Sequence, residues 1–286
     1  MKTQRKFILG DEWIYYKIYL GEYASDLVLV DLISNISKKF IENKIIDKFF
    51  FIRYNENGYH IRVRFHLVNN SKISTVIDTF NKMIKESFEK NIIYKIQVDT
   101  YERELERYYG DCVIYSENIF YHDSLVTLEF LSALHKFNLD ENYRWLFGIY
   151  SIDFLIKDFG FELHDRFKIM ELLNESFSKE FNINKGLTKQ LDSKFRFEKD
   201  KITQLLNDGN KDFESLLRLR SSNISDDIKK IKAKLNNDEL VKILVSYIHM
   251  SCNRLFRSNP RKHEFVLYHF LWKYYRSAVG RISHQN

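Results

Sequence analysis

The segment FFIRYNENGYHIRVRF, residues 50–65, predicts two antiparallel strands joined by a turn. Asn57-Gly58 is a dipeptide that hairpin turns favour, because both residues tolerate positive φ. The runs on either side are rich in aromatic and β-branched residues, which are typical of strands. We therefore expect strands over residues 46–54 and 59–67, paired through this turn.

The patterns on either side of the hairpin extend it to a unit of six elements. Residues 13–20 are strongly apolar and aromatic, and apolar side chains alternate through residues 92–98, so both segments are predicted strands. Helical spacing predicts one helix before the hairpin and one after it; the apolar positions are Leu29, Leu32, Ile33, Ile36 and Phe40, then Ile73, Val76, Ile77, Phe80, Ile84 and Phe88. The order β-α-β-β-α-β is the ferredoxin-like arrangement, an antiparallel sheet with two helices on one face.

From about residue 115 onward the patterns are helical. Three clear examples are apolar residues 125–134, 240–248 and 265–275, the last of which follows Pro260. The predicted fold class is α+β. We expect a single domain over residues 1–286, with a sheet-containing half (1–112) and a helical half (113–286).

Composition limits the functional classes. The 286 residues are 44% hydrophobic and 16% aromatic, which is typical of a globular chain. No apolar run is long enough to span a bilayer, and the N-terminus has no secretory signal pattern. Cys112 and Cys252 form no disulfide or zinc pattern, so a cytoplasmic location is the simplest expectation. No motif points to a nucleotide or metal cofactor.

The charge is unevenly distributed along the chain. The net charge is +6, and residues 185–286 carry 21 basic against 11 acidic side chains. Such a basic region could attract nucleic acid or an acidic peptide. The alternative is a solvated helical surface, which we favour for the lysine run at Lys229, Lys230, Lys232 and Lys234.

The hairpin carries the first candidate for chemistry. Alternate residues of a strand share a face, so His60, Arg62 and Arg64 are expected on the side of the sheet away from its helices. Two arginines at this spacing can hold a carboxylate or a phosphate. A solvent-exposed sheet face without function remains the alternative interpretation.

Two further candidates lie later in the chain. In residues 101–108, a helix would put Glu104 and Arg107 one turn apart, although internal ion pairs on a charged surface would give the same pattern. His249 and Asn253 are also one turn apart. A histidine can act as a general acid or base near neutral pH, but a lone helical histidine is more often structural.

Together these segments resemble one family, the thiopeptide-type bacteriocin biosynthesis domain, which forms the C-terminal part of lantibiotic dehydratases or a separate protein in split systems. The resemblance spans about residues 13–276. Four blocks carry it in the family order: FFIRY (50–54) with HIRVRF (60–65), YERELERY (101–108), SENIF (116–120) with Asp123-Ser124, and His249-Met250 with Asn253-Arg254.

The resemblance implies a two-step dehydration of a ribosomal precursor peptide. A separate subunit would transfer glutamate from glutamyl-tRNA to a Ser or Thr hydroxyl. This chain, a lyase, would then eliminate glutamate and leave dehydroalanine or dehydrobutyrine. The resemblance implies four catalytic residues, Arg62, Arg64, Arg107 and His249, and we expect substrate binding by Arg53, His60, Glu104, Asn253 and Arg254.

Two positions depart from the family pattern. The family has Gly where this chain has Tyr109, and a bulkier residue beside Arg107 is expected to reshape the pocket. Asn259-Pro260-Arg261 stands where a turn containing Gly is expected.

Alternatives to elimination remain open. A pyridine-forming cyclase of the same family would join two dehydroamino acids of a peptide by a formal [4+2] cycloaddition. A non-catalytic subunit would bind the precursor peptide through its sheet or its basic helices. Binding of RNA is disfavoured because the aromatic motif of RNA-recognition sheets is absent, and a homodimer is compatible with the sequence.

Overall fold

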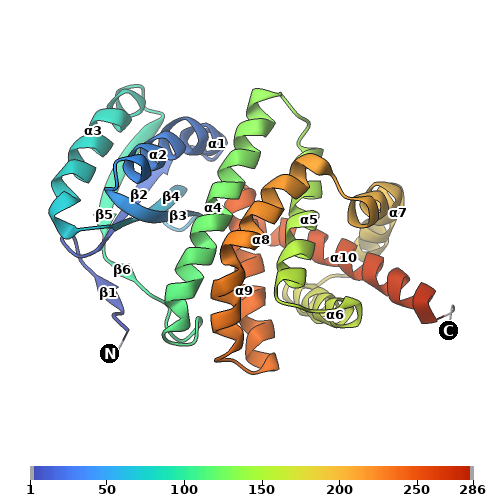
Figure 1. Ribbon diagram of the computed structural model, residues 1–286. Helices are drawn as coiled ribbons and strands as arrows, with labels where there is room; N and C mark the ends of the chain where they lie inside the picture. Colours follow the sequence, from blue (N-terminus) through green and yellow to red (C-terminus); the bar gives the residue numbers. More distant parts are fainter. Residues whose placement is uncertain (1–2, 284–286) are drawn as a thin grey trace.

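The computed structural model describes residues 3–283, with a sheet at one end of the molecule and long helices at the other (Figure 1). The main sheet has the strand order β3-β4-β2-β5. Its strands are β2 (Trp13–Leu20), β3 (Ile46–Tyr54), β4 (His60–Leu67) and β5 (Ile93–Asp99). All neighbouring strands are antiparallel, which confirms the four predicted strands and the hairpin.

The connection between β3 and β4 uses the predicted turn residues. Asn57 and Gly58 have φ values of 56° and 102°, so both lie in the region that this dipeptide tolerates. The loop covers residues 55–59 and is therefore longer than a two-residue turn. The register pairs Ile52 of β3 with Arg62 of β4.

Helices cover one face of the sheet (Figure 1). The first covering segment contains η1 (Glu22–Ala24), α1 (Ser25–Leu27), the π-helical η2 (Val28–Ile33) and α2 (Ser34–Glu42), and the second contains η3 (Asn70–Lys72) and α3 (Ile73–Glu89). Tyr16 stacks on Phe80 of α3 with ring centroids 4.0 Å apart, and Phe65 meets Phe40 of α2 edge-on. These contacts bury the face of the sheet that carries Tyr16 and Phe65.

A second, two-stranded sheet was not predicted from the sequence. It pairs β1 (Lys6–Phe7) with β6 (Tyr101–Glu102) in antiparallel register. Phe7 stacks on Tyr101, whose ring also meets Trp13 of β2. The small sheet therefore fixes the segment that leaves the main sheet and enters the helical half.

The helical half contains seven long helices within the described residues: α4 (Cys112–Lys136), α5 (Asn142–Asp158), α6 (Leu163–Glu180), α7 (Lys185–Asp208), α8 (Lys211–Lys232), α9 (Asn237–Leu255) and α10 (Pro260–Ser283). Helix α4 lies between the sheet and the other helices, contacting β3 on one side and α8 and α9 on the other (Figure 1). The predicted α+β class with a helical C-terminal part is confirmed. None of the helices described here combines the length and apolar character that a membrane span requires.

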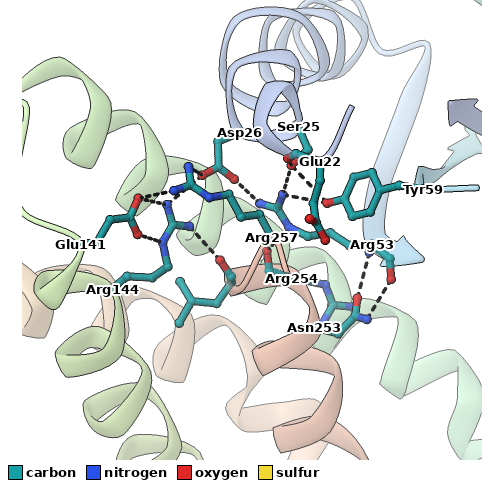
Figure 2. A network of polar contacts seen from close by, with 11 residues as sticks. Glu22, Ser25, Asp26, Arg53, Tyr59, Glu141, Arg144, Asn253, Arg254 and Arg257 are labelled. Atoms are coloured by element: carbon teal, nitrogen blue, oxygen red, sulfur yellow. Dashed lines mark hydrogen bonds and ion pairs between the residues drawn. The ribbon is translucent and has the colours of Figure 1, made fainter. Parts of the chain in front are cut away.

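A buried ionic network joins the two halves (Figure 2). Asp26 of α1 lies 2.6 Å from Arg53 of β3, 2.7 Å from Arg144 of α5 and 3.7 Å from Arg257 after α9. Burial alone raises the pKa of Asp26, but attraction to Arg53 and Arg144 outweighs it and leaves the pKa below its usual value. The carboxylate is therefore charged at neutral pH and holds elements from both halves.

The same arginines satisfy the end of α9. Arg53 donates its Nε–H to the carbonyl of Arg254, and Arg144 donates to the carbonyl of Leu255, both at 2.8 Å. Carbonyls in the last turn of a helix have no partner within the helix and carry its partial negative charge. The two guanidinium groups thus fix where α9 ends relative to β3 and α5.

This network predicts a specific cost for losing Asp26. Asp26→Asn leaves Arg53 and Arg144 buried with less compensating charge, and we expect the free energy of unfolding to fall by about 3 kcal/mol. Urea denaturation measures the change. Asp31→Asn, at an exposed acid of η2, is the matched control and should be close to neutral. A D26N protein as stable as the control would contradict the role of this network.

Candidate functional site

The face of the sheet away from α2 and α3 carries the predicted basic residues. His60, Arg62 and Arg64 alternate along β4 with residues that pack under the helices, so they share the opposite face as predicted. Their partners on β2 are Tyr19, Lys17 and Tyr15, in that order.

Arg62 is held in place by His60. Its Nε lies 3.0 Å from Nε2 of His60, and its guanidinium lies over the ring of Tyr54 at 3.4 Å from the centroid. Nδ1 of His60 is 2.8 Å from the carbonyl oxygen of Gly58. This arrangement requires a neutral imidazole that donates from Nδ1 and accepts at Nε2. His60 therefore positions Arg62. The lone pair on Nε2 of His60 is occupied by the hydrogen bond from Arg62.

Arg64 is a buried cation surrounded by aromatic rings. Its side chain is 8% exposed, and its guanidinium lies 4.4 Å from the ring centroid of Tyr15, 4.9 Å from that of Tyr101 and 5.1 Å from that of Phe50. Within residues 3–283 it has no ion pair with a carboxylate, and its Nε has no hydrogen-bond partner. A buried charge without a partner is costly, so Arg64 is well suited to receive an anion.

The acidic group that contacts Tyr101 is paired with a different arginine. Glu117 of α4 accepts two hydrogen bonds from Arg103, each at 2.6 Å, and a third from the phenol of Tyr101 at 2.8 Å. This buried pair neutralises itself and orients the Tyr101 ring against Arg64. Glu117 belongs to the SENIF segment of the sequence, but its pairing with Arg103 could not be predicted from the spacing of the two residues.

Arg107 connects the loop after β6 to α9. Its Nε donates to Oγ of Ser246 at 3.2 Å, and a terminal nitrogen donates to Glu104 at 3.2 Å. Residues 105–111 form turns rather than the helix considered from the sequence. The turn reverses at Tyr109, whose φ is 52°. A glycine meets this requirement without strain, which explains the family preference at the position where this chain has tyrosine.

One face of α9 is directed at the sheet half. Ser246, His249 and Asn253 are spaced three and four residues apart, so they lie on neighbouring positions of that face. Ser246 binds Arg107, and Asn253 uses both ends of its amide to bind the backbone N–H and carbonyl of Arg53, each at 2.8 Å (Figure 2). His249 lies between these two contacts, so its helix position is fixed close to the loop of Arg107 and the edge of β3.

Arg254 lies close to the same basic cluster but is paired. It donates to Asp123 at 3.2 Å and to Ser124 at 3.1 Å, and Asp123 also binds Arg220 at 2.9 Å. Burial lowers the pKa of Arg254, Asp123 opposes that shift, and the nearby charge of Arg64 adds to it. The Asp123-Ser124 block of the sequence therefore serves to hold Arg254.

The predicted substrate-binding residues differ in accessibility. Arg53 is 2% exposed and is fully occupied by Ser25, Asp26 and the end of α9 (Figure 2). Arg254 is also buried, whereas Glu104 is exposed. Contacts of Arg53 and Arg254 are internal, and direct binding of substrate by any of these residues stays a prediction.

The tyrosines beside the arginines are poor proton acceptors. Burial raises the pKa of Tyr108 to about 12, and burial together with Glu117 raises that of Tyr101 well above its usual value. Both phenols therefore stay neutral and can donate hydrogen bonds. Burial likewise raises the pKa values of Cys112 and Cys252, so neither thiol is activated. Of the four predicted catalytic residues, His249 is the one whose side-chain type serves as a general acid or base, and its described contact is with Glu264 of α10.

Two features of the described residues bear on ligand binding. Among residues 3–283, no group of three His, Cys, Asp or Glu side chains is arranged to hold a metal ion. A cavity of about 530 Å³ lies between α5, α7 and the start of α10, lined by residues such as Trp145 and Lys262. None of the four predicted catalytic residues lines it, so this cavity is separate from the arginine cluster.

The chain is similar in sequence and in fold to known proteins of lantibiotic biosynthesis. The chain belongs to the lantibiotic biosynthesis dehydratase C-terminal family, whose model matches residues 13–275. It is 28% identical over 266 residues to the epidermin biosynthesis protein EpiB of Staphylococcus epidermidis and 25% identical over 272 residues to the nisin biosynthesis protein NisB of Lactococcus lactis. These alignments cover 90% and 93% of this chain but 25% and 26% of the relatives, so the chain spans about a quarter of their length.

Solved structures show the same fold. The tRNA-dependent lantibiotic dehydratase MibB from Microbispora sp. 107891 superposes with a TM-score of 0.75 at 18% identity, over 98% of this chain and 29% of MibB. The pyridine synthase TbtD from thiomuracin biosynthesis superposes with a TM-score of 0.71 at 10% identity, over 95% of this chain and 100% of TbtD.

The neutral state of His60 predicts a pH dependence of stability. Burial lowers its pKa, Arg62 adds to that shift, and the Gly58 carbonyl opposes it. Below about pH 6.5 the unfolded chain binds a proton at this histidine while the folded chain resists it, so stability is lost as the pH falls. Urea denaturation of H60Q should show a smaller loss between about pH 6.5 and pH 5 than the wild type. An identical loss in both proteins would rule out the neutral, Arg62-bound His60.

Proposed function

We propose that this chain eliminates glutamate from glutamylated Ser or Thr residues of a ribosomal precursor peptide. The observation that supports this most is Arg64, a buried guanidinium for which no carboxylate partner is found among residues 3–283, with Arg62 two residues before it on the same strand. Arg107 lies in the loop after β6 and donates a hydrogen bond to Ser246 of α9. The family supports action on a peptide, and the charge of this cluster supports an acidic group as the part that is bound.

The reaction needs the two kinds of group found here. A base removes the α-proton of the glutamylated residue, the Cβ–O bond breaks, and the electron pair leaves with the glutamate carboxylate. Arg62, Arg64 and Arg107 stabilise negative charge on the leaving glutamate, and such electrostatic stabilisation is usually the largest catalytic contribution. His249 is the group we assign to accept the proton. On this proposal the chain is a lyase.

The other predicted residues have supporting parts in the proposal. His60 orients Arg62, and Glu104 orients Arg107. Arg53 and Asn253 join β3 to α9, while Arg254 adds positive charge behind Arg64. Substrate binding by this second group would be mainly indirect, through the placement of the catalytic side chains.

The proposal extends to organisation and partners. Residues 1–286 would form one elimination domain with a ferredoxin-like sheet half, which the strand order β3-β4-β2-β5 and the helices on one face support. A separate subunit would supply the glutamylation step from glutamyl-tRNA. Both subunits would work in the cytoplasm, and no cofactor is assigned.

A second candidate is a pyridine-forming cyclase. The observation in its favour is the similarity to TbtD, which extends over the whole of that chain. An already dehydrated peptide separates the two activities, because a cyclase converts it to a cyclic product while an eliminase leaves it unchanged. Mass spectrometry of that single incubation with the purified chain distinguishes them.

Variants of the cluster should stop the reaction after glutamylation. R64M keeps the bulk of the side chain, removes a buried unpaired charge, and should lower elimination by about 10²–10³-fold. R107A and H249A should also trap the glutamylated peptide when the chain is co-expressed with its glutamylating partner and precursor.

The matched control is R196A, at an exposed arginine of α7. Because R64M removes an uncompensated charge, its free energy of unfolding should equal or exceed that of the wild type. Full dehydration by all three variants would overturn the assignment of these residues. A peptide that stays wholly unglutamylated would place the chain in an earlier step.

A further inference from the structure

Glu264 lies behind His249 and is completely buried. Its side chain is 0% exposed, on the second turn of α10. Oε1 lies 2.7 Å from Nδ1 of His249, while Oε2 lies 3.1 Å from Arg261 and 3.4 Å from the phenol oxygen of Tyr268. Both carboxylate oxygens therefore have defined partners, and one of them is a predicted catalytic residue.

The start of α10 determines where Glu264 lies. Asn259 has a φ of 44°, a conformation that asparagine tolerates better than most residues, and Pro260 begins the helix immediately after it. Glu264 follows one turn later, with Arg261 three residues before it and Tyr268 four residues after it. The departure at Asn259-Pro260-Arg261 noted in the sequence is thus the segment that places Glu264 against α9.

One cation and two neutral groups lie around the carboxylate of Glu264. Arg261 of its own helix lies against the Phe177 ring and also pairs with Glu180 of α6. Tyr268 of α10 and Cys252 of α9 are the neutral groups that face it. Burial raises the pKa values of both Cys252 and Tyr268, and the charge of Glu264 adds to each shift. Arg261 is thus the compensating charge that lets Glu264 remain buried as an anion.

We propose that Glu264 is the positioning residue of His249, an inference that rests on the proposed elimination function. An ionised carboxylate can accept but cannot donate, so the proton of the neutral imidazole is held on Nδ1. Nε2 then carries the lone pair, and no contact of this atom is described within residues 3–283. The imidazole is 24% exposed, so Nε2 can be reached by a substrate.

The position of α9 determines what that lone pair can reach. Ser246 and Asn253 flank His249 on its helix face and bind Arg107 and the β3 edge. Elimination transfers the α-proton to Nε2, and the imidazolium that forms is stabilised by Glu264 through Nδ1. Glu264 does not touch the peptide in this account, and it acts through the tautomer and orientation of His249.

A double-mutant cycle tests this role. Single-turnover elimination from a peptide with one pre-glutamylated serine is compared in the wild type, E264Q, H249A and E264Q/H249A. We expect E264Q to lower the maximal rate by about 10–100-fold, the range found for groups that orient a functional histidine, with little change in the half-saturating peptide concentration. In the H249A background the same change should have almost no effect, because the residue that transmits it is gone.

Controls separate positioning from stability. Y268F removes another hydrogen bond of the same carboxylate without touching His249 and should keep the wild-type rate. An equal loss of rate in both backgrounds, or no loss in either, would overturn the positioning role. An inactive wild type would instead overturn the proposed function itself.

A spectroscopic measurement covers the case in which E264Q fails to fold. Nitrogen-15 NMR of the wild-type protein reports which ring nitrogen of His249 carries the proton in the neutral form. The Nδ1-protonated tautomer is expected. An Nε2-protonated ring would overturn the proposal without any assay of activity.

Discussion

The ionic contact between Asp26 and the arginines of β3 and α5 is the constraint on which the junction of the two halves depends (Figure 2). Arg53 and Arg144 also satisfy the last carbonyls of α9, so one carboxylate of α1 determines where that helix ends. Asn253 adds a pair of hydrogen bonds to the β3 backbone. His249 lies one turn earlier on the same helix, so these contacts also limit where it can lie relative to the sheet.

The arginines of this chain fall into two groups with different physical roles. Arg103 and Arg220 are buried against the carboxylates of Glu117 and Asp123, and such pairs fix the packing of the helical half. Arg64 is buried against aromatic rings instead, and no carboxylate in the described part of the chain pairs with it. Aromatic faces attract a cation but leave its hydrogen-bond donors free. That difference is why we propose Arg64, and not Arg103 or Arg220, as the group that binds an anion.

Local patterns predicted the sheet well because each depends on neighbours in the sequence. The alternation in residues 59–65 and the Asn57-Gly58 dipeptide predicted the hairpin and the face that Arg62 and Arg64 share. The pairing of β1 with β6 joins segments about 95 residues apart, and no local pattern reports it. Glu264 could not be predicted for the same reason. Its contact with His249 depends on how α10 packs against α9. The turn at residues 105–111 could not be predicted, because the spacing of its charged residues also suits a helix.

The central claim is that Arg62, Arg64 and Arg107 receive the glutamyl group. The most direct measurement is a crystal structure of this chain with a peptide whose glutamyl ester is replaced by the corresponding amide, which cannot be eliminated in the same way. We expect the glutamyl carboxylate to lie within hydrogen-bonding distance of Arg64. We also expect the α-carbon of the modified residue to face Nε2 of His249. A glutamyl group bound elsewhere, for example in the cavity beside Lys262 and Trp145, with Arg64 still unpaired, would contradict it.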